Sequence, residues 1–424
     1  MTATTTATMP ETATDAASKG QTDAYRQSQM MLPFLDAIAD AGGRAHTKTL
    51  CDGVAERLGV DGDARTARRS CGAAGNINVF DRSVRWAAQR AKAMGYARPI
   101  GNGDWEITGK GKAALRNARP GTLVTFFLVG ATGIALWGSC QDAVRILDDD
   151  SVNLLLTSPP YPLLRKKNYG NVDADAYCDW FLRIAEDWPR KLAKDGSLVI
   201  NLADVWEKGQ PTVSEYQFDL VSRLKRELGL HLCQWGVWHN PSKLPAPAEW
   251  VTRTRQRLKP GIETYFWFSP TPFPKADNRK VLRPYSKSML RRLAAGGEKG
   301  ATRPSGHALK AGAFSTDNGG SIADNVLIAA NTRSNTAYHK ACAAAGLPAH
   351  PARFPEELPE FFIKFLTDEA DLVYDPFGGS GTTAAVAHRL NRRWVMSEMA
   401  LDYIRGAALR FHGVSGFQEC ALAA

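Results

Sequence analysis

From about residue 130 onward, short apolar runs typical of strands alternate with amphipathic runs typical of helices. The strand-like runs include SVNLLLTS, GSLVINLA, ETYFWFS, DLVYDPFGG and RRWVMSE, and the helical runs include AYCDWFLRIAEDWPRKLAK and TTAAVAHRL. Such alternation predicts an α/β fold with a mostly parallel sheet, whose ligands bind at the carboxyl ends of the strands. We assign this main domain to residues 130–424.

A smaller unit is predicted at residues 25–120. Three runs with a helical apolar period are followed by GDWEITGKGKAALRNA, which indicates a short strand, a glycine turn and a helix. Together they predict a winged-helix DNA-binding domain, with the arginine-rich third helix, VFDRSVRWAAQRAKAMG, facing DNA. Residues 1–24 are rich in Thr and Ala and lack an apolar core, so we expect a disordered tail.

Positive charge is concentrated in two segments of the chain. The formal net charge is +10, yet residues 25–120 alone hold 16 Lys/Arg against 9 Asp/Glu. A second basic segment interrupts the α/β pattern, because residues 271–320 carry ten Lys/Arg against three Asp/Glu and are rich in Gly and Ser. Two basic segments in an otherwise slightly acidic chain favour two contact surfaces for phosphates.

The cysteines and the one long uncharged stretch exclude other classes of protein. None of the seven cysteines forms a C-x-x-C pair, so no zinc site, other metal site or disulfide framework is predicted, and reduced thiols fit a cytoplasmic protein. Residues 121–138 carry no charge, but four glycines and three threonines interrupt them. We interpret this stretch as a linker and a strand that enters the sheet, and we predict no membrane span.

The stretch LLLTSPPYP, residues 154–162, ends a buried strand abruptly. Three leucines are typical of a strand covered on both faces, and two consecutive prolines then remove two backbone donors. The turn places a hydroxyl and an aromatic ring on either side of the prolines. Ser158 and Tyr161 thus flank Pro159 and Pro160.

A second candidate site follows the strand DLVYDPFGG. Glycines between a strand and a helix let a ligand approach the backbone, and the helix N-terminus favours an anionic group. Glu398 ends the next strand, 17 residues after Gly381, a spacing that suits a ribose diol. The loop lacks the lysine of an ATP-binding loop, which disfavours ATP. The candidate cofactor-binding residues here are Asp375, Phe377, Gly378, Gly379, Ser380, Gly381, Thr382 and Glu398.

TSPPY and DPFGGSGTT together resemble the S-adenosylmethionine-dependent DNA amino-methyltransferases, which methylate N4 of cytosine or N6 of adenine. The first motif precedes the second by more than 200 residues, as in the permuted β group of that family. LWGSCQDAVRIL resembles the segment whose acidic residue, here Asp142, contacts the cofactor adenine. HPARFPEELPEFFIKFLT resembles the element beside the methionine end of the cofactor.

This resemblance implies a Rossmann-like methyltransferase sheet with a target-recognition insert at residues 271–335. The phrases MLPFLDAIADAGG and GDWEITGKGKAAL resemble the N-terminal domain of Mrr-type restriction proteins. The implied cofactor is S-adenosyl-L-methionine and the implied partner is double-stranded DNA. A cognate restriction endonuclease is a further candidate partner, and the oligomeric state is left open.

The resemblance also makes Ser158, Pro159, Pro160 and Tyr161 candidate catalytic residues. The target base leaves the helix and stacks on Tyr161, and its amino group donates to Ser158 and to the carbonyl of Pro159. Members with Ser at the first position, as with Ser158, usually act on cytosine N4, so we expect an N4-cytosine enzyme. An N6-adenine enzyme of the same fold is the alternative.

Two other classes of protein remain as alternatives. One is a DNA-binding regulator with an inactive methyltransferase domain, against which the intact motifs argue; the other is a restriction nuclease subunit, for which no nuclease element is evident. The segment WVTRTRQRLKPGIETYFWF contains Arg253, Arg255 and Arg257, which either contact phosphates or line a solvated edge strand.

Overall fold

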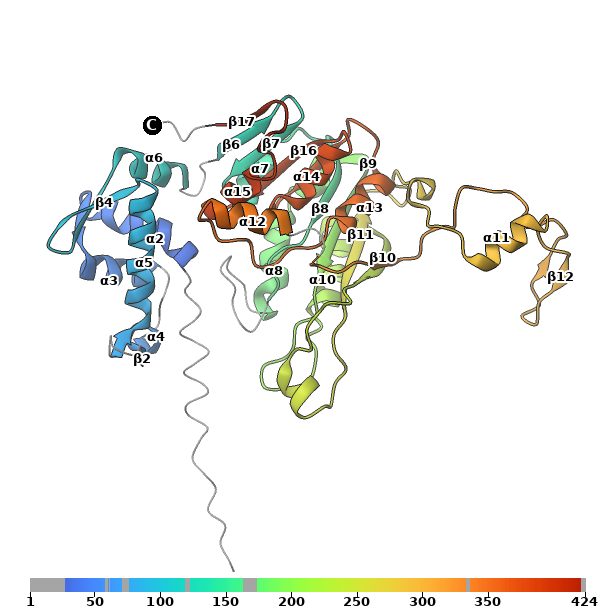
Figure 1. The fold of residues 1–424 in the computed structure, drawn as a ribbon, viewed down its shortest axis with the longest axis horizontal. Coiled ribbons are helices and arrows are strands. Elements are labelled where there is room, and N and C mark those ends of the chain that lie inside the picture. The colour runs from blue at the N-terminus through green and yellow to red at the C-terminus, as the bar shows by residue number, and fades with distance from the viewer. Residues whose placement is uncertain are drawn as a thin grey trace, which may run out of the picture.

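The computed structural model describes residues 27–57, 60, 62–70, 76–118, 123–162, 174–332 and 336–420. The tail predicted at residues 1–24 lies outside this range. Figure 1 shows an N-terminal group of helices beside a large twisted sheet, with two extensions leading away from the sheet.

The N-terminal domain has the predicted order of helices followed by a β-wing. Its helices are α2 (Gln27–Asp40), α3 (Thr47–Arg57), α4 (Gly62–Thr66), α5 (Val79–Ala93) and α6 (Gly109–Ala118). Its strands are β1 (Arg44–His46), β2 (Arg68–Ser70), β3 (Asn76–Asn78), β4 (Ala97–Gly101) and β5 (Asp104–Ile107). Strands β1, β5 and β4 form one antiparallel sheet, which includes the wing, and the pair β2–β3 was not predicted.

Helix α5, the predicted DNA-facing helix, begins at a local capping signal. The side chain of Asn78 accepts a hydrogen bond from the backbone N–H of Asp81, which satisfies one of the donors at the helix start. Phe80, Val84 and Ala88 are buried on its inner face. The side chain of Arg85 and half of the surface of Trp86 remain exposed on the outer face.

The main sheet has ten strands in the order β14-β10-β11-β9-β8-β15-β16-β7-β6-β17. Neighbours from β9 to β7 pair in parallel, whereas β11 and β6 run antiparallel at the two flanks of this parallel centre. The strands are β6 (Val124–Val129), β7 (Gly133–Trp137), β8 (Val152–Thr157), β9 (Leu192–Leu202), β10 (His231–His239), β11 (Ile262–Ser269), β14 (Val326–Ile328), β15 (Leu372–Asp375), β16 (Arg393–Glu398) and β17 (Phe417–Glu419).

Helices cover both faces of the sheet, as the alternating pattern predicts. The helices of the main domain are α7 (Cys140–Arg145), α8 (Ala174–Ala185), α9 (Trp188–Lys191), α10 (Tyr216–Leu228), α11 (Lys287–Ala294), α12 (Thr336–Ala344), α13 (Glu357–Leu366), α14 (Thr382–Arg389) and α15 (Leu401–Ala408). The short turns η2 (Glu249–Arg253) and η3 (Asn278–Val281) and the hairpin β12 (Ala301–Thr302) with β13 (Ala308–Leu309) lie outside the sheet.

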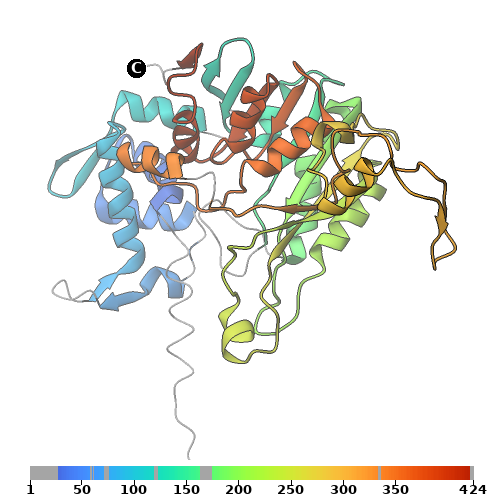
Figure 2. The ribbon, with the colours of Figure 1, turned by 45° about the vertical axis from the view of Figure 1, so that its right-hand side comes forward.

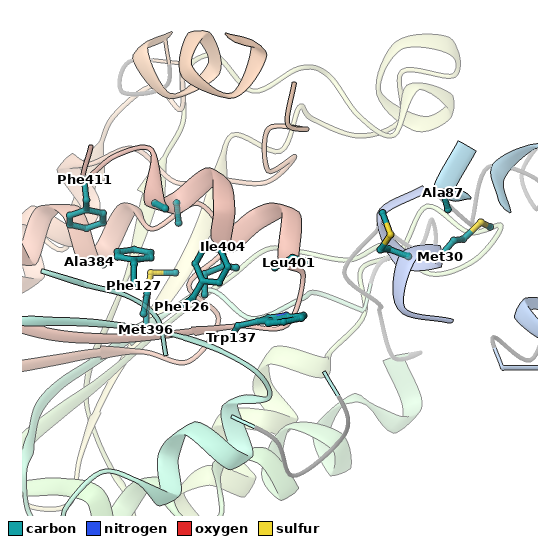
Figure 3. Close-up of a cluster of buried hydrophobic side chains, with 14 of the residues drawn as sticks. Met30, Ala87, Phe126, Phe127, Trp137, Ala384, Met396, Leu401, Ile404 and Phe411 are labelled. Carbon is teal, nitrogen blue, oxygen red and sulfur yellow. The ribbon is translucent and has the colours of Figure 1, made fainter. Parts of the chain in front are cut away.

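Strand β8 shows why the leucine run is buried on both faces. Leu154 and Leu156 belong to the cluster that includes residues of α13 and α14, whereas Leu155 belongs to the cluster that includes residues of α8 and α10. Each leucine is at most 1% exposed. Burial of one such side chain contributes about 1.5–3 kcal/mol. Part of the first cluster, with Phe127, Met396 and Phe411, appears in Figure 3.

In the main domain the structure departs from the sequence prediction in two places and excludes one of the two alternatives left open for Arg253. Residues 121–138 contain two strands, β6 and β7, joined as an antiparallel hairpin, where a linker and one strand were expected. Within the predicted insert 271–335, β14 pairs with β10 and so belongs to the main sheet. Arg253 ends the turn η2 in the β10–β11 connection, so no edge strand forms there.

An ion pair connects the N-terminal domain to the main domain. The guanidinium of Arg90 on α5 lies 2.9 Å from the carboxylate of Asp402 on α15, and Asp402 is buried. In Figures 1 and 2 the N-terminal helices lie at the end of the sheet where α15 is found. The ion pair uses the side of α5 that carries Arg90, and Arg85 on the same helix is exposed.

Candidate active site

The two motifs meet at the carboxyl ends of neighbouring strands. β8 and β15 pair in parallel, with Leu154 opposite Val373, so the S-P-P-Y turn and the glycine-rich loop leave the sheet side by side. A direct hydrogen bond joins them, because Thr157 Oγ1 donates to Asp375 Oδ1 at 2.9 Å across 218 residues of sequence. Both side chains are buried.

Asp375 is a buried anchor for the loop that follows it. Its carboxylate also accepts from Thr383 Oγ1 at 2.7 Å and from the backbone N–H of Phe377 at 3.1 Å. Burial raises the pKa of Asp375 to about 6, although these hydrogen bonds favour the charged form. The contacts indicate that Asp375 positions the loop and α14, and its predicted contact with a cofactor stays a prediction.

Backbone geometry explains the glycines of the loop. Gly379 and Gly381 have φ angles of +51° and +70°, in the left-handed region that a side chain disfavours. Gly378 donates its N–H to the carbonyl of Ser397 at 2.9 Å, and Gly381 donates to Gly378 at 2.8 Å. The ring of Phe377 lies 6.1 Å from that of Trp180 on α8, measured between centroids.

The loop hydroxyls point into the supporting structure. Ser380 and Thr382 are buried, and their side-chain oxygens lie 2.9 Å apart. Arg410, which follows α15, donates to the carbonyl of Ser380 at 2.7 Å and to Thr382 Oγ1 at 3.3 Å. Sequence reasoning missed Arg410, because nothing in its local sequence marks it as a neighbour of a loop 30 residues earlier.

Glu398 lies at the end of β16, directly beside the loop. Its Oε2 accepts from the backbone N–H of Gly379 at 2.9 Å, and its Oε1 accepts from that of Ala400 at 2.7 Å. Desolvation raises the pKa of Glu398 to about 7, against the effect of these two donors. A carboxylate in this position can accept hydrogen bonds from a ribose diol, as the spacing predicts.

Asp142 lies one strand away from Glu398. Glu398 pairs with Trp137 at the end of β7, and α7 begins three residues later at Cys140. Ser139 caps α7 by accepting from the N–H of Asp142 at 3.0 Å, and its hydroxyl donates to Asp142 Oδ2 at 2.6 Å. The structure therefore brings the segments of Asp142 and Glu398 together at the carboxyl ends of β7 and β16, although 256 residues separate them in the sequence.

The two raised carboxyl pKa values predict a pH-dependent stability of the cofactor-free protein. Asp375 and Glu398 have ordinary pKa values of 3.8 and 4.5, so between these values and about 6 and 7 the folded state binds more protons than the unfolded state. Their contribution to the free energy of unfolding is therefore complete below about pH 4 and is lost as the pH rises through 6 and 7.

We expect Glu398→Gln to remove the upper part of this dependence, because the amide does not titrate. Urea unfolding from pH 5 to 8, without cofactor, measures it. The stability difference between the variant and the original chain should grow in the variant's favour as the pH rises. A difference that stays constant across this range would contradict the raised pKa.

The S-P-P-Y turn forms a hydrogen-bonded network with two strands. Ser158 Oγ lies 2.7 Å from the hydroxyl of Tyr161, which donates to Glu263 Oε2 at 3.1 Å. The amide of Asn201 donates to Tyr161 at 3.1 Å and to Glu263 at 2.8 Å. Pro159 is buried, whereas Ser158, Pro160 and Tyr161 are half-buried.

Sequence reasoning missed Asn201 and Glu263. Asn201 lies near the end of β9, and Glu263 lies near the start of β11, which runs antiparallel to β9. The carboxyl end of β9 therefore lies beside the amino end of β11, which brings Asn201 and Glu263 together. A polar residue at the edge of an apolar run, as in VINLAD and GIETYFWF, is the signal that could have found both.

Within the described ranges, no group of three or more His, Cys, Asp or Glu side chains is arranged to hold a metal ion. None of the helices in the described part of the chain has both the length and the apolar character that crossing a membrane requires.

Comparisons with known proteins agree with this geometry. The sequence model of a family described as DNA methylase matches residues 152–409, and that of the Mrr N-terminal domain matches residues 28–117. Type II methyltransferase M.PvuII of Proteus hauseri is 46% identical over 277 residues, which are 65% of this chain and 82% of the relative. Type II methyltransferase M.BglII of Bacillus subtilis is 28% identical over 268 residues, 63% of this chain and 65% of the relative.

A solved structure named PvuII DNA methyltransferase (cytosine-N4-specific) superimposes with a TM-score of 0.55 at 38% identity. The match covers 67% of this chain and 87% of that structure. The family match spans the S-P-P-Y turn, the glycine-rich loop and Glu398, which the fold places at one edge of the sheet. This chain therefore belongs to the DNA methylase family, as an S-adenosylmethionine-dependent DNA methyltransferase with an N-terminal domain of the Mrr type.

Proposed function

We propose that this enzyme methylates the exocyclic N4 of a flipped cytosine within a specific site of double-stranded DNA. The observation that carries the proposal is the position of the Ser158 hydroxyl. It lies at the carboxyl end of β8, hydrogen-bonded to Tyr161, beside the glycine-rich loop that follows β15. The solved structure at 38% sequence identity, which is named cytosine-N4-specific, supports the choice of base.

The residues at the loop fit S-adenosylmethionine. Glu398 offers a carboxylate to a ribose diol, Asp142 offers one to the adenine, and the glycine backbone at the start of α14 suits the carboxylate of the methionine end. The ring of His350 lies close to Gly379, because a Cβ built on Gly379 would approach its Nε2 to 3.2 Å. When bound, this cofactor supplies a methyl group on an electrophilic sulfonium.

The S-P-P-Y turn activates the amino nitrogen of cytosine, which is a poor nucleophile by itself. The lone pair of the cytosine amino nitrogen is delocalised into the ring, so the nitrogen attacks weakly. Ser158 Oγ and the carbonyl of Pro159 accept its two hydrogens, which draws the nitrogen towards tetrahedral geometry and returns the lone pair to it. With S-adenosylmethionine held at the glycine-rich loop, this nitrogen would bond to the methyl carbon in line as the bond from that carbon to the sulfonium sulfur breaks. The sulfur would leave as the neutral thioether of S-adenosylhomocysteine, and the surplus proton of the nitrogen would pass to Ser158 or to water.

Nucleoside analysis tests this proposal. The full chain is incubated with plasmid DNA and S-adenosylmethionine carrying a labelled methyl group, and the hydrolysed DNA is examined by mass spectrometry. We expect N4-methylcytosine as the labelled nucleoside. If N6-methyladenine were the only labelled nucleoside, the target base would be adenine and the enzyme class would stand. Unlabelled DNA would favour an inactive DNA-binding protein.

We also propose that the two basic segments contact DNA outside the flipped base. The exposed face of α5 carries Arg82, Arg85 and Trp86 at helical spacings of three and four. Helix α11 carries Arg291 and Arg292 in its last turn and extends away from the sheet in Figure 1. Residues 271–325, up to β14, are the part of the insert that we assign to target recognition.

Arg85→Ala is expected to weaken binding to DNA of any sequence. Loss of one phosphate contact should lower the slope of log affinity against log salt by about 0.9 and leave the methylated base unchanged. Fluorescence anisotropy at several salt concentrations measures this. Arg226→Ala, an exposed arginine on α10, is the matched control and should leave the slope as it is. An unchanged slope for Arg85→Ala would remove α5 from the DNA interface.

A cognate restriction endonuclease is the further partner that we propose, because the relatives at 46% and 28% identity are named type II methyltransferases. The proposal places the enzyme in the cytoplasm, in keeping with the free cysteines of the described residues. Methylation at its site would then protect the DNA from that endonuclease.

A further inference from the structure

Tyr161 is the centre of the hydrogen-bonded network at the S-P-P-Y turn. Its hydroxyl lies within hydrogen-bond distance of three side chains: Ser158 at 2.7 Å, Asn201 at 3.1 Å and Glu263 at 3.1 Å. Asn201 also donates to Glu263 at 2.8 Å. The four side chains come from β9, from β11 and from the turn after β8, so the fold alone assembles them.

The direction of each hydrogen bond follows from the number of protons available. A carboxylate has no proton to give, so Glu263 must accept from both Tyr161 and Asn201. This fixes the amide nitrogen of Asn201 towards Glu263 and Tyr161. The phenol of Tyr161 has one proton, which it donates in a hydrogen bond to Glu263. Its oxygen therefore accepts hydrogen bonds from Asn201 and Ser158. Ser158 must therefore donate to Tyr161.

This direction matters for methyl transfer. The serine hydroxyl has one proton and two lone pairs. With its proton committed to Tyr161, Ser158 presents only lone pairs to the target amino group. Accepting a hydrogen bond from the amine is the role that activates the nitrogen, whereas a hydroxyl free to rotate would spend part of its time as a donor.

We propose that Glu263 is a positioning residue that sets the Ser158 hydroxyl as an acceptor, acting through Tyr161. The inference rests on the proposed function, because it gives Ser158 the role of amine acceptor. Glu263 touches neither base nor cofactor in this scheme. It acts because it stands at the end of the chain of hydrogen bonds and can only accept.

The surroundings of Glu263 hold it in this position. Its side chain is 14% exposed, and Lys243 Nζ lies 3.2 Å from its Oε1. Its Oε2 is left to Tyr161 and Asn201, and Asn201 is only 1% exposed. The ion pair with Lys243 also offers a simpler role, in which Glu263 merely joins β11 to the segment after β10.

A double-mutant cycle separates the two roles. The variants are Glu263→Gln, Tyr161→Phe and the pair combined. Glutamine keeps the shape of the side chain but can donate as well as accept, and phenylalanine removes the hydroxyl that transmits the direction. The measurements are the single-turnover rate of methyl transfer at saturating DNA and cofactor, the calorimetric affinity for S-adenosylmethionine, and the melting temperature.

We expect Glu263→Gln to slow the transfer about tenfold while its cofactor affinity stays unchanged. Tyr161→Phe should slow it at least as much, and the double variant should be no slower than Tyr161→Phe. Equal slowing by Glu263→Gln in both backgrounds would assign it a structural role and overturn the proposal. A full rate for Glu263→Gln would overturn it as well.

Two controls allow the result to be interpreted. Glu227→Gln makes the same substitution in an ion pair with Arg223 on α10 and should leave the rate unchanged. Should Glu263→Gln fail to fold, Tyr161→Phe decides, and a full rate there would overturn the proposal. The assay counts methyl groups on whichever base receives them, so an adenine product would refute the N4 proposal without affecting this test.

Discussion

Gly378→Arg is expected to abolish binding of S-adenosylmethionine and to lower the stability of the fold. A Cβ built on Gly378 lies 2.5 Å from Met396 Cε and 3.1 Å from Met396 Cβ. Met396 is fully buried in β16 and cannot move aside freely. A long side chain there must push the loop away from β16, and this displaces the backbone groups that line the cofactor site.

We expect the cofactor affinity to fall more than about a hundredfold, which corresponds to a loss of roughly 3 kcal/mol. Overpacking of this kind costs about 1–3 kcal/mol of folding free energy. Calorimetric titration and urea unfolding measure the two effects. Gly109→Arg, at an exposed glycine with nothing within 4 Å of a built Cβ, is the control. A destabilised but folded variant that binds the cofactor normally would exclude this loop from the cofactor site.

Ser158→Ala is expected to slow methyl transfer while leaving cofactor and DNA binding nearly unchanged. The hydroxyl matters most as the amino nitrogen changes geometry, so its loss raises the barrier more than it weakens binding. One such hydrogen bond is worth about 1–3 kcal/mol, or roughly ten- to hundredfold in rate. The carbonyl of Pro159 would remain as the other acceptor.

Single-turnover kinetics with saturating DNA and cofactor tests this expectation. Ser151→Ala is a suitable control, because its hydroxyl bonds only to the carbonyl of Asp148 at the other end of β8. A full rate for Ser158→Ala would remove Ser158 from the mechanism and leave Pro159 as the principal acceptor. It would also weaken the N4 proposal, which depends on this serine.

Elements with a strong local pattern were predicted well. The period of the apolar residues and the capping signals indicated the N-terminal helices, and the short apolar runs indicated most strands of the main sheet. These signals depend on neighbours within a few residues, so the sequence alone carries them. The hairpin β6–β7 was missed because its turn lies inside an uncharged stretch, where no charged or proline residue marks the end of a strand.

The sequence by itself determined which residues are candidates for the chemistry: the serine and prolines after a buried strand, the glycines before a helix, and Glu398 at the end of the next strand. Residue type and local spacing suffice for this, and they were enough to indicate the family. Only the tertiary structure decided what these residues touch. It made Asp375 an anchor between two motifs and added Asn201 and Glu263 to the candidate active site.

The physical reason is the order of the strands in the sheet. Local patterns predict that a segment is a strand, but the neighbours of that strand depend on packing between segments far apart in the chain. β8 lies between β9, which is near it in sequence, and β15, which is distant in sequence. Hydrogen bonds such as those from Thr157 to Asp375 and from Tyr161 to Glu263 exist only once that order is set.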